Sequence, residues 1–410
     1  MRDRLGLTVI LGALSAFGPL SVDFYLPGLP KLTADFHASA SAGQLTLTGC
    51  VLGLALGQLA IGPLSDRLGR RPPLLAGLVL YCAASLACAA APSIWVFVAL
   101  RVVQGLSGAA GIVVARSVVR DLVSGAAAAR LYSILMLVLG VVPVAAPVAG
   151  GQLLAVTSWR GLFVILALVD AAILAGTVLW LHETLPHERR TTLGATTSGL
   201  VDLLRDRYFL TYSLVVGLAF ASMFGYIAGS SFVLQDVYGI SPQLYGVVFG
   251  VNALGLVACS QLNRALVGRV APGRLLLAGV AAQAAAGAAL VGIVLAGGVG
   301  LPGVLPCLFV TVAALGVVMP NATALALTDY PHAAGSASAL LGTMQFLFGA
   351  ATAPLVGVAG KETAVPMALM IGVFGVAGLA AAAVARRAAA PAEARAQGAA
   401  LPASQATPRA

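Results

Sequence analysis

Charged residues are scarce in this sequence. They make up 9% of the 410 residues, against about 25% in a typical soluble domain. Hydrophobic residues make up 60% and the mean hydropathy is +0.99. Such a chain has too little polar surface to coat a soluble globule, so we predict a polytopic helical membrane protein.

Lysine and the usual catalytic motifs are also missing. The two lysines, Lys31 and Lys361, do not lie in a Gly-x-x-x-x-Gly-Lys-Ser/Thr loop, which excludes a self-contained P-loop ATPase. Gly-x-Ser-x-Gly and His-Glu-x-x-His do not occur either, so we do not expect an enzyme. An ion gradient remains as the energy source, with the proton favoured, and we expect no cofactor.

The cysteines and the net charge point away from metals and nucleic acids. All five cysteines lie in apolar runs without metal-ligand spacing, so we interpret them as small core residues without disulfides. A net charge of +9 would suggest a nucleic-acid partner for a soluble protein. Here the arginines gather in loops, so we expect them to set the membrane topology and expect no nucleic-acid partner.

Twelve apolar runs are each long enough for the roughly 20 residues that a helix needs to cross a bilayer. Arg2 and Arg4 precede the first run as in a signal peptide, but no small-residue cleavage site follows, and we interpret it as the first span. The runs lie near 5–26, 43–63, 73–91, 94–115, 131–155, 161–181, 209–233, 243–265, 274–296, 302–326, 333–358 and 364–385.

Arginines lie mostly in alternate loops, on one side of the predicted membrane. The positive-inside rule therefore predicts that both termini are cytoplasmic. The longest polar connector divides the spans into two groups of six, and the tail is rich in alanine and proline. We predict a six-helix bundle at 1–181, a cytoplasmic linker at 182–208, a second six-helix bundle at 209–385 and a disordered cytoplasmic tail at 386–410.

Internal repetition supports two related halves. Ala146-Pro147 followed by Gly150 recurs as Ala353-Pro354 followed by Gly357. Gly69-Arg70, between spans 2 and 3, recurs as Gly268-Arg269 between spans 8 and 9. We therefore predict an all-α membrane protein with twelve transmembrane helices in two pseudo-symmetric bundles.

The segment 62–73, GPLSDRLGRRPP, concentrates charge between spans 2 and 3. We expect Gly62 and Gly69 to turn the backbone of a short loop, and Asp66 to be an ion-pair centre. The string resembles the loop between helices 2 and 3 of major facilitator superfamily transporters, and an ordinary positive loop would leave Asp66 and the glycines unexplained. The matching positions are Gly62, Leu64, Asp66, Arg67, Gly69, Arg70 and Arg71.

The resemblance implies a conformational switch. In that family the loop acid is thought to latch the two halves in the outward-facing state, through charge partners at the end of helix 4 and at the start of helix 11. Here those places correspond to Arg116 with Arg120-Asp121 and to 329–335.

Asp23 follows the first apolar run in Asp23-Phe24-Tyr25-Leu26-Pro27. This string and 231–246 resemble the Bcr/CflA group of drug:proton antiporters, which includes bicyclomycin and chloramphenicol exporters. We interpret Asp23 as the proton carrier; the alternative is an interfacial residue that ends the helix. Arg101, in a stretch similar to the family's fourth-helix motif, lies at nearly the same depth. A direct Asp23–Arg101 contact is a hypothesis, and the alternative is an arginine that snorkels to the surface.

Span 5 carries two prolines and paired glycines. Gly140, Pro143, Pro147, Gly150 and Gly151 resemble the motif found in antiporters and generally missing from importers, which favours export. Proline kinks are common in membrane helices, so the motif alone is weak evidence.

Aromatic and amide side chains supply the substrate candidates. An apolar cavity with a few polar groups would suit a moderately hydrophobic organic molecule. The candidates are Tyr25, Gln104, Phe224, Tyr226, Phe232, Asn252, Asn321 and Gln345. Asp170, near the middle of span 6, is either protonated and packed against a neighbour or a second titratable site.

We therefore predict a monomeric, proton-coupled exporter of lipophilic antimicrobials in the inner membrane, with a small-molecule substrate, protons and the lipid bilayer as partners. An exporter of an endogenous metabolite or amino-acid derivative is the alternative, and a non-transporting membrane receptor is the alternative from another class.

Overall fold

The computed structural model describes residues 2–123, 125–186, 188, 190, 203–297, 299–328, 330, 334–358, 360 and 363–399. Nearly all of them are helical. In chain order the elements of the first half are α1 (Arg2–Ser15), α2 (Phe17–Asp23), η1 (Leu26–Gly28), α3 (Leu29–Asp35), α4 (Ala40–Leu68), α5 (Arg71–Ala89), α6 (Ile94–Leu122), α7 (Gly125–Leu153) and α8 (Trp159–Trp180). Those of the second half are α10 (Arg207–Phe232), η4 (Val233–Val237), α11 (Pro242–Leu266), α12 (Pro272–Ala296), α13 (Gly300–Leu327), α14 (Ala334–Val356) and α15 (Val365–Ala399).

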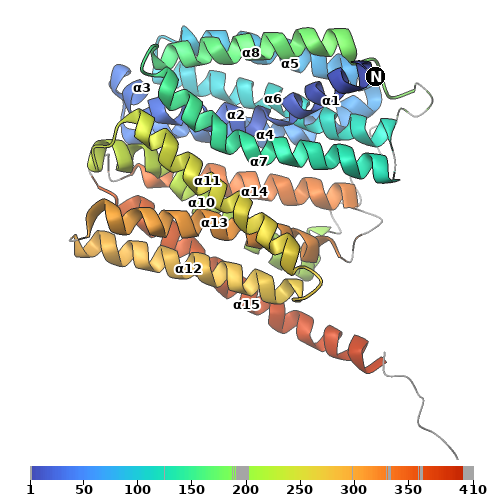
Figure 1. The fold of residues 1–410 in the computed structure, drawn as a ribbon, viewed down its shortest axis with the longest axis vertical. Coiled ribbons are helices and arrows are strands. Elements are labelled where there is room, and N and C mark those ends of the chain that lie inside the picture. The colour runs from blue at the N-terminus through green and yellow to red at the C-terminus, as the bar shows by residue number, and fades with distance from the viewer. Residues whose placement is uncertain are drawn as a thin grey trace, which may run out of the picture.

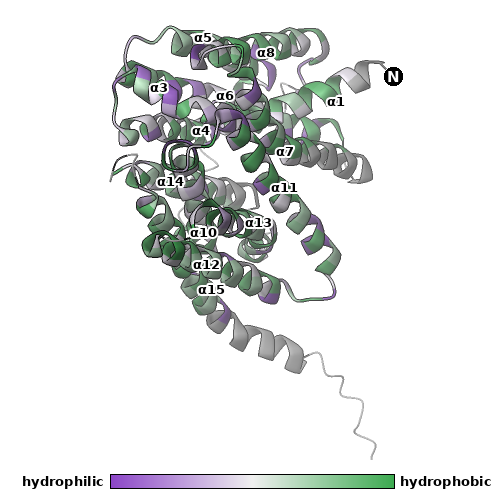
Figure 2. Ribbon diagram, turned by 60° about the vertical axis from the view of Figure 1, so that its left-hand side comes forward, coloured by the Kyte–Doolittle hydropathy of each residue, from purple (hydrophilic) through white to green (hydrophobic). Residues whose placement is uncertain are grey.

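Each of the twelve predicted spans corresponds to helix. Among the described residues, nine helices are long and apolar enough to cross a membrane, or ten if a bent pair counts as one span. The other two, α7 and α14, contribute the shorter apolar segments Gly140–Leu153 and Leu340–Val356. Figure 2 shows hydrophobic residues along much of the helices and hydrophilic residues mainly toward their ends, as a bilayer requires.

The first span is broken rather than continuous. Its two parts, Gly6–Ser15 and Phe17–Asp35, meet at an angle of 46°. Pro19 explains the break, because its ring clashes with the carbonyl of the residue four positions earlier, Ser15, and it has no amide hydrogen to donate.

Helix packing in the first half recurs six spans later. The contacts of α4 with α6 match those of α11 with α13, and the contacts of α5 with α6 and α8 match those of α12 with α13 and α15. Figure 1 shows α1 to α8 in one half of the molecule and α10 to α15 in the other. Between the halves, α4 packs against α14, and α7 packs against α11. The two contacts are equivalent, because α4 corresponds to α11 and α7 corresponds to α14 in the repeat. The predicted fold of two pseudo-symmetric bundles is confirmed.

Small residues let the central helices approach closely. A Cβ atom on Gly105 of α6 would collide with the carbonyl of Cys50 on α4, and one on Gly316 of α13 would collide with the carbonyl of Leu256 on α11. Backbone contact of this kind is how membrane helices pack without a hydrophobic driving force between them.

The repeated Gly-Arg pairs share a backbone conformation. Gly69 has φ +98° just before α5, and Gly268 has φ +92° in the turn before α12. Gly62 does not turn the chain, contrary to our expectation: α4 continues through it to Leu68, so that only two residues separate α4 from α5. Asp66 and Arg67 therefore lie on the last turn of α4. Because successive residues of a helix point about 100° apart around its axis, their side chains point to different sides.

The end of the chain also differs from the expectation. α15 continues to Ala399, whereas the sequence predicted a disordered tail from 386. The stretch after Arg387 is dominated by alanine, the strongest helix former, which extends the helix. The remaining tail, 400–410, and most of the predicted linker, including 191–202, lie outside the described residues.

Candidate functional site

A cavity of about 330 Å³ lies between the two halves. Three of the eight predicted substrate residues line it, namely Phe224, Tyr226 and Gln345. The lining also includes residues outside those eight candidates. These are Ser15, Gln58, Phe220, Met223, Ile227, Phe249 and Phe346, besides small and aliphatic side chains of both halves. The spacing of Phe220, Phe224 and Ile227 places them on one face of α10 and was the available signal.

Asp23 is the last residue of α2, within the second part of the broken first span, and it lines the cavity. It is only 6% exposed, yet it makes no hydrogen bond or ion pair within the described part of the chain. It lines the cavity together with Tyr226 of the second half. The cavity therefore contains a nearly buried carboxyl group without a partner, which is an unstable arrangement for a charged acid.

Arg101 does not contact Asp23, and the hypothesised pair is absent from this structure. Its guanidinium donates to the carbonyls of Ser21 (2.6 Å) and Thr46 (3.4 Å) and to the amide oxygen of Gln104. The residue is fully buried, which also contradicts the alternative of snorkelling to the surface. Asp23 lies two residues after Ser21, whose carbonyl Arg101 binds. The two residues are thus near each other along the chain path, but the direction of the Arg101 side chain was not predicted.

Two predicted substrate residues belong to the surroundings of Arg101 instead. The guanidinium lies 4.5 Å from the ring centre of Tyr25 and 5.5 Å from that of Phe163, a cation–π arrangement. The Gln104 side chain is held between Arg101 and the Ser85 hydroxyl, to which it donates at 2.7 Å. Tyr25 and Gln104 therefore orient the arginine and do not line the cavity.

The cavity is closed between the halves near the start of α4, which is the predicted outer side. Ser41 donates to the carbonyl of Pro354 (3.4 Å), Gln44 to that of Ala228 (3.3 Å) and Thr48 to that of Ala350 (3.1 Å). All three bonds join α4 to the second half. The structure thus has one closed side.

The predicted antiporter motif of α7 borders both the cavity and this closed side. Gly140 and Pro143 line the cavity. Gly150 leaves room only for the carbonyl of Phe24, and Gly151 lies against the carbonyl of Pro242 at the start of α11. The carbonyl of Pro147 occupies the space where Gly246 of α11 would carry a Cβ.

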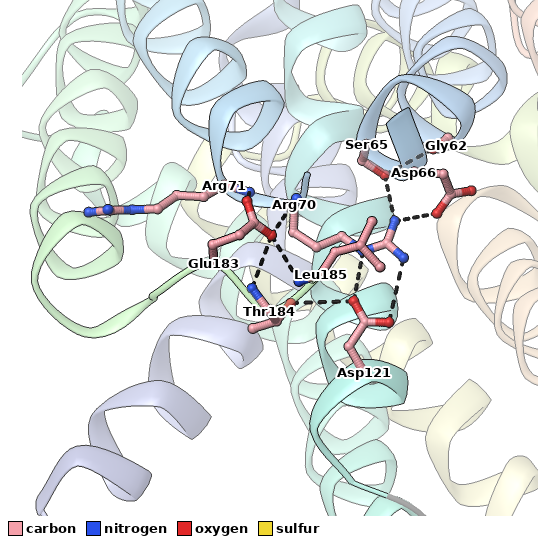
Figure 3. A network of polar contacts seen from close by, with 9 residues as sticks. All are labelled: Gly62, Ser65, Asp66, Arg70, Arg71, Asp121, Glu183, Thr184 and Leu185. Carbon is pink, nitrogen blue, oxygen red and sulfur yellow. Dashed lines mark hydrogen bonds and ion pairs between the residues drawn. The ribbon is translucent and has the colours of Figure 1, made fainter. Parts of the chain in front are cut away.

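At the other end of the bundle, Arg70 is the centre of a polar network (Figure 3). It donates to Asp66 (2.5 Å), to Asp121 (2.8 Å) and to the Ser65 hydroxyl (3.0 Å). Arg70 is 2% exposed and Asp66 40%. The expected ion pair of Asp66 is present with Arg70, but in the described part of the chain Asp66 forms none with Arg71 or with Arg67, which is exposed on the last turn of α4. Arg70, and not Asp66, is therefore the centre of the network. Arg116 instead lines the cavity.

Glu183, at the start of the linker, joins this network and was missed by sequence reasoning. Its carboxylate accepts the backbone N–H groups of Arg70 (2.9 Å) and Arg71 (3.1 Å), and so caps α5. Partial burial raises the pKa of Glu183, but backbone hydrogen bonds from Leu185, Arg70, Arg71 and Thr184 outweigh it and hold the pKa below its usual value. Thr184 donates to Asp121 (3.3 Å), which completes the connection.

The predicted latch partner near 329–335 cannot be placed in this network. Residues 329 and 331–333 lie outside the described residues, as do the side chains of 334–336. Within the described part, the network involves the first half and the linker.

A family model described as Major Facilitator Superfamily matches residues 9–354. The chain belongs to the major facilitator superfamily. It is 38% identical over 381 residues to a Bacillus subtilis protein named uncharacterized MFS-type transporter YdgK, covering 92% of this chain and 94% of that protein. It is 31% identical over 364 residues to a Haemophilus influenzae protein named bicyclomycin resistance protein homolog, covering 88% and 91%. This confirms the resemblance to the Bcr/CflA group.

Solved structures of this superfamily share the transporter's fold. A bacterial homologue of the human lysosomal transporter Spinster, described as inward-facing and occupied, superposes with a TM-score of 0.74 at 16% identity, covering 94% of this chain and 97% of that one. A D-xylose–proton symporter superposes with a TM-score of 0.70 at 16% identity, covering 92% and 95%.

The remaining candidates of this major facilitator superfamily transporter lie outside its cavity. Asn252 donates to the Tyr226 hydroxyl (2.9 Å) and so joins α11 to α10. Asn321 donates to Asn263 (2.5 Å) and so joins α13 to α11. Phe232 packs near Gly43. Asp170 is 1% exposed and neither carboxyl oxygen has a hydrogen-bond partner among the described residues, so the structure leaves both interpretations of it open.

Proposed function

We propose that the transporter is a proton-coupled exporter that moves lipophilic antimicrobial small molecules across the inner membrane. The observation that carries the proposal is the Asp23 carboxyl, which has no partner in the described ranges of the chain, in a mostly apolar cavity between the halves. An acid in such a place favours its protonated form until water or a cation reaches it. It can therefore take up a proton in one state of the cycle and release it in another.

We propose that the two halves move relative to each other, so that the cavity opens to one side of the membrane at a time. The three hydrogen bonds from α4 to the second half close one side of the cavity, and they would break when that side opens. On the opposite side we propose that Asp66, held by Arg70, docks on the start of α14 when that side closes. A carboxylate is stabilised at a helix N-terminus by the helix dipole.

The energy source and the placement in the membrane belong to the same proposal. The sequence has no ATP-binding loop, and the proton gradient is the energy source that suits Asp23. Arginine-rich loops favour cytoplasmic termini, so that the closed side in this structure is the outer one. We propose that the transporter works as a monomer, because the cavity is enclosed by helices of a single chain.

Drug susceptibility tests the proposal. The chain is expressed in a bacterial strain lacking its main efflux pumps, and growth is measured against a panel of lipophilic antimicrobials that includes bicyclomycin and chloramphenicol. We expect resistance to at least one compound, lost in Asp23→Asn, and accumulation of that compound when a protonophore is added. Resistance that Asp23→Asn retains, or export that ignores the protonophore, would contradict the proposal.

A further inference from the structure

The turn between α11 and α12 repeats the backbone of the turn between α4 and α5. Gly268-Arg269 occupies the place of Gly69-Arg70, and both glycines have a positive φ, +92° and +98° respectively. The side chains around the two turns nevertheless differ. The Glu183 carboxylate lies where a Cβ atom of Gly69 would be, whereas no described atom lies within 4 Å of the corresponding position on Gly268. The second turn is therefore open to its surroundings.

The acids that hold Arg70 have no counterparts in the second half. Arg70 is paired with Asp66 of α4 and Asp121 of α6 (Figure 3). In the repeat, Ala265 stands at the position of Asp66, and α13, the counterpart of α6, contains no acidic residue. Arg70 is only 2% exposed, whereas Arg269 is an exposed residue. The second turn thus keeps the arginine and lacks the carboxylates that neutralise it in the first.

Two further arginines lie on either side of Arg269. Arg264 stands on the last turn of α11 and Arg274 on the first turn of α12, and both are exposed. These three arginines are the only charged residues between positions 237 and 328. In the described ranges of the chain, none of their guanidinium groups forms a hydrogen bond or an ion pair. The turn therefore concentrates positive charge for which the described structure provides no anion.

Apolar side chains are exposed beside these charges. Leu262, near the end of α11, is 55% exposed, and Val267, in the turn itself, is 51% exposed. At the boundary of a bilayer, arginine heads project to the headgroup layer while neighbouring apolar groups contact the acyl chains. The surface therefore fits a molecule that has both an anionic group and hydrocarbon chains.

We infer that this surface, formed by Leu262, Arg264, Val267, Arg269 and Arg274, binds the headgroup of an anionic phospholipid. Guanidinium groups hold phosphate oxygens through paired, charge-assisted hydrogen bonds, and basic clusters at the membrane boundary bind acidic lipids. The bilayer would thus provide to the second half the anion that the first half provides from its own aspartates. This lipid site goes beyond the proposed export function and depends on neither the cargo nor the proton.

Protection of individual arginines in the unaltered chain tests the lipid site. The purified full chain is placed in nanodiscs of phosphatidylcholine, with or without phosphatidylglycerol of the same acyl chains. Phenylglyoxal then modifies accessible guanidinium groups, and peptide mass spectrometry measures the rate at each arginine. We expect phosphatidylglycerol to slow the modification of Arg264, Arg269 and Arg274 by about fivefold each, the size expected for one arginine at an anionic bilayer surface.

Arg120 and Arg205 are the internal controls. Both are exposed, and each is followed in the sequence by an aspartate. They lie on the same side of the membrane as the turn, because α6 and α11 both end there and α10 begins there. An anionic bilayer lowers the pH at its surface and so slows phenylglyoxal at every exposed arginine of that side. Equal slowing at all five arginines would indicate this surface effect alone and would overturn the lipid site.

Lipid titration in detergent measures the contribution of the charges. Phosphatidylglycerol should raise the unfolding temperature of the purified chain. The double variant Arg269→Gln/Arg274→Gln should need about 25-fold more of this lipid for the same increase. The charge-matched variant Arg120→Gln/Arg205→Gln should respond as the unaltered chain does. A titration that is unchanged in the Arg269→Gln/Arg274→Gln variant would refute the site, and failure of that variant to fold would leave the protection experiment as the test.

Inorganic phosphate distinguishes a lipid headgroup from a free anion. It has the same phosphate chemistry but no acyl chains to contact Leu262 and Val267. Added to nanodiscs of phosphatidylcholine alone, it should leave the modification rates of the three arginines unchanged. Protection by phosphate equal to that by phosphatidylglycerol would assign the site to a soluble anion and refute the lipid. Neither outcome affects the export proposal, whose susceptibility and protonophore measurements do not involve this turn.

Discussion

At the scale of single residues, Arg101 is the charge that organises the first half. It is fully buried and makes no ion pair within the described residues, so carbonyl dipoles, an amide and two aromatic faces stabilise it. The planar guanidinium can donate in several directions at once, which a lysine cannot do. Its contacts tie α6 to both α2 and α4 beside Asp23, the acid that we propose carries the proton.

We predict that Arg101→Lys lowers the free energy of unfolding by about 1–3 kcal/mol, because buried acceptors lose their donors. Chemical unfolding of the purified protein in detergent measures the change. Arg264→Lys, at an exposed position on α11, is the control and should have little effect. Equal stability of the two variants would show that the directional donors of Arg101 are unimportant.

At the scale of elements, the break between α4 and α5 depends on a residue far along the chain. Glu183 accepts the first N–H groups of α5, which have no partners inside their own helix. Gly69 is needed there for two reasons. It has a positive φ, and a Cβ atom would collide with the Glu183 carboxylate. The start of the linker therefore fixes the position from which Arg70 reaches Asp66 and Asp121.

Hydrogen exchange at the start of α5 tests this cap. In Glu183→Gln the amides of Arg70 and Arg71 should exchange faster, whereas Glu188→Gln, at an exposed neighbouring position, should leave them unchanged. The pKa of Glu183 is held below its usual value, so its stabilisation is complete above that value and is lost as the pH falls through the lowered pKa. If the protection of these amides, relative to their intrinsic exchange rates, changes neither in the variant nor on acidification, the cap is refuted.

The packing of α7 on α11 gives a second test at this scale. A Cβ atom on Gly151 would collide with the carbonyl of Pro242, so Gly151→Ala should disfavour closure of the predicted outer side. Spin labels at Val156 and Val358, both exposed on that side, should move apart. Gly292→Ala, where a Cβ meets nothing, is the control. An unchanged distance distribution in Gly151→Ala would mean that this contact does not hold the side closed.

At the scale of the whole molecule, the sequence was sufficient to predict the number of spans and the position of a residue along its helix. The twelve spans were recognisable because a bilayer requires about 20 apolar residues per helix, and the depths of Asp23 and Arg101 follow from the rise per residue. Rotation about the axis was not predictable. It decides that Arg101 reaches the Ser21 carbonyl, that Arg70 replaces Asp66 as the network centre, and that Asn321 faces Asn263.

Contacts between distant segments were also out of reach of the sequence. Nothing in the local pattern around Glu183 indicates that it caps α5, and the aromatic lining of the cavity is assembled from three helices of the second half. The bend of the first span could have been anticipated from Pro19, since a proline inside a helix acts on the residue four positions earlier.

The central claim is that Asp23 exchanges a proton for cargo within a cavity that opens to one side at a time. Its most direct test is transport by the purified protein in liposomes, with an imposed pH gradient and the compound to which expression confers the largest resistance. The account predicts accumulation that requires the gradient, proton movement in the opposite direction, and loss of both in Asp23→Asn. Accumulation that persists after the pH gradient has collapsed, or gradient-driven accumulation that Asp23→Asn retains, would contradict it.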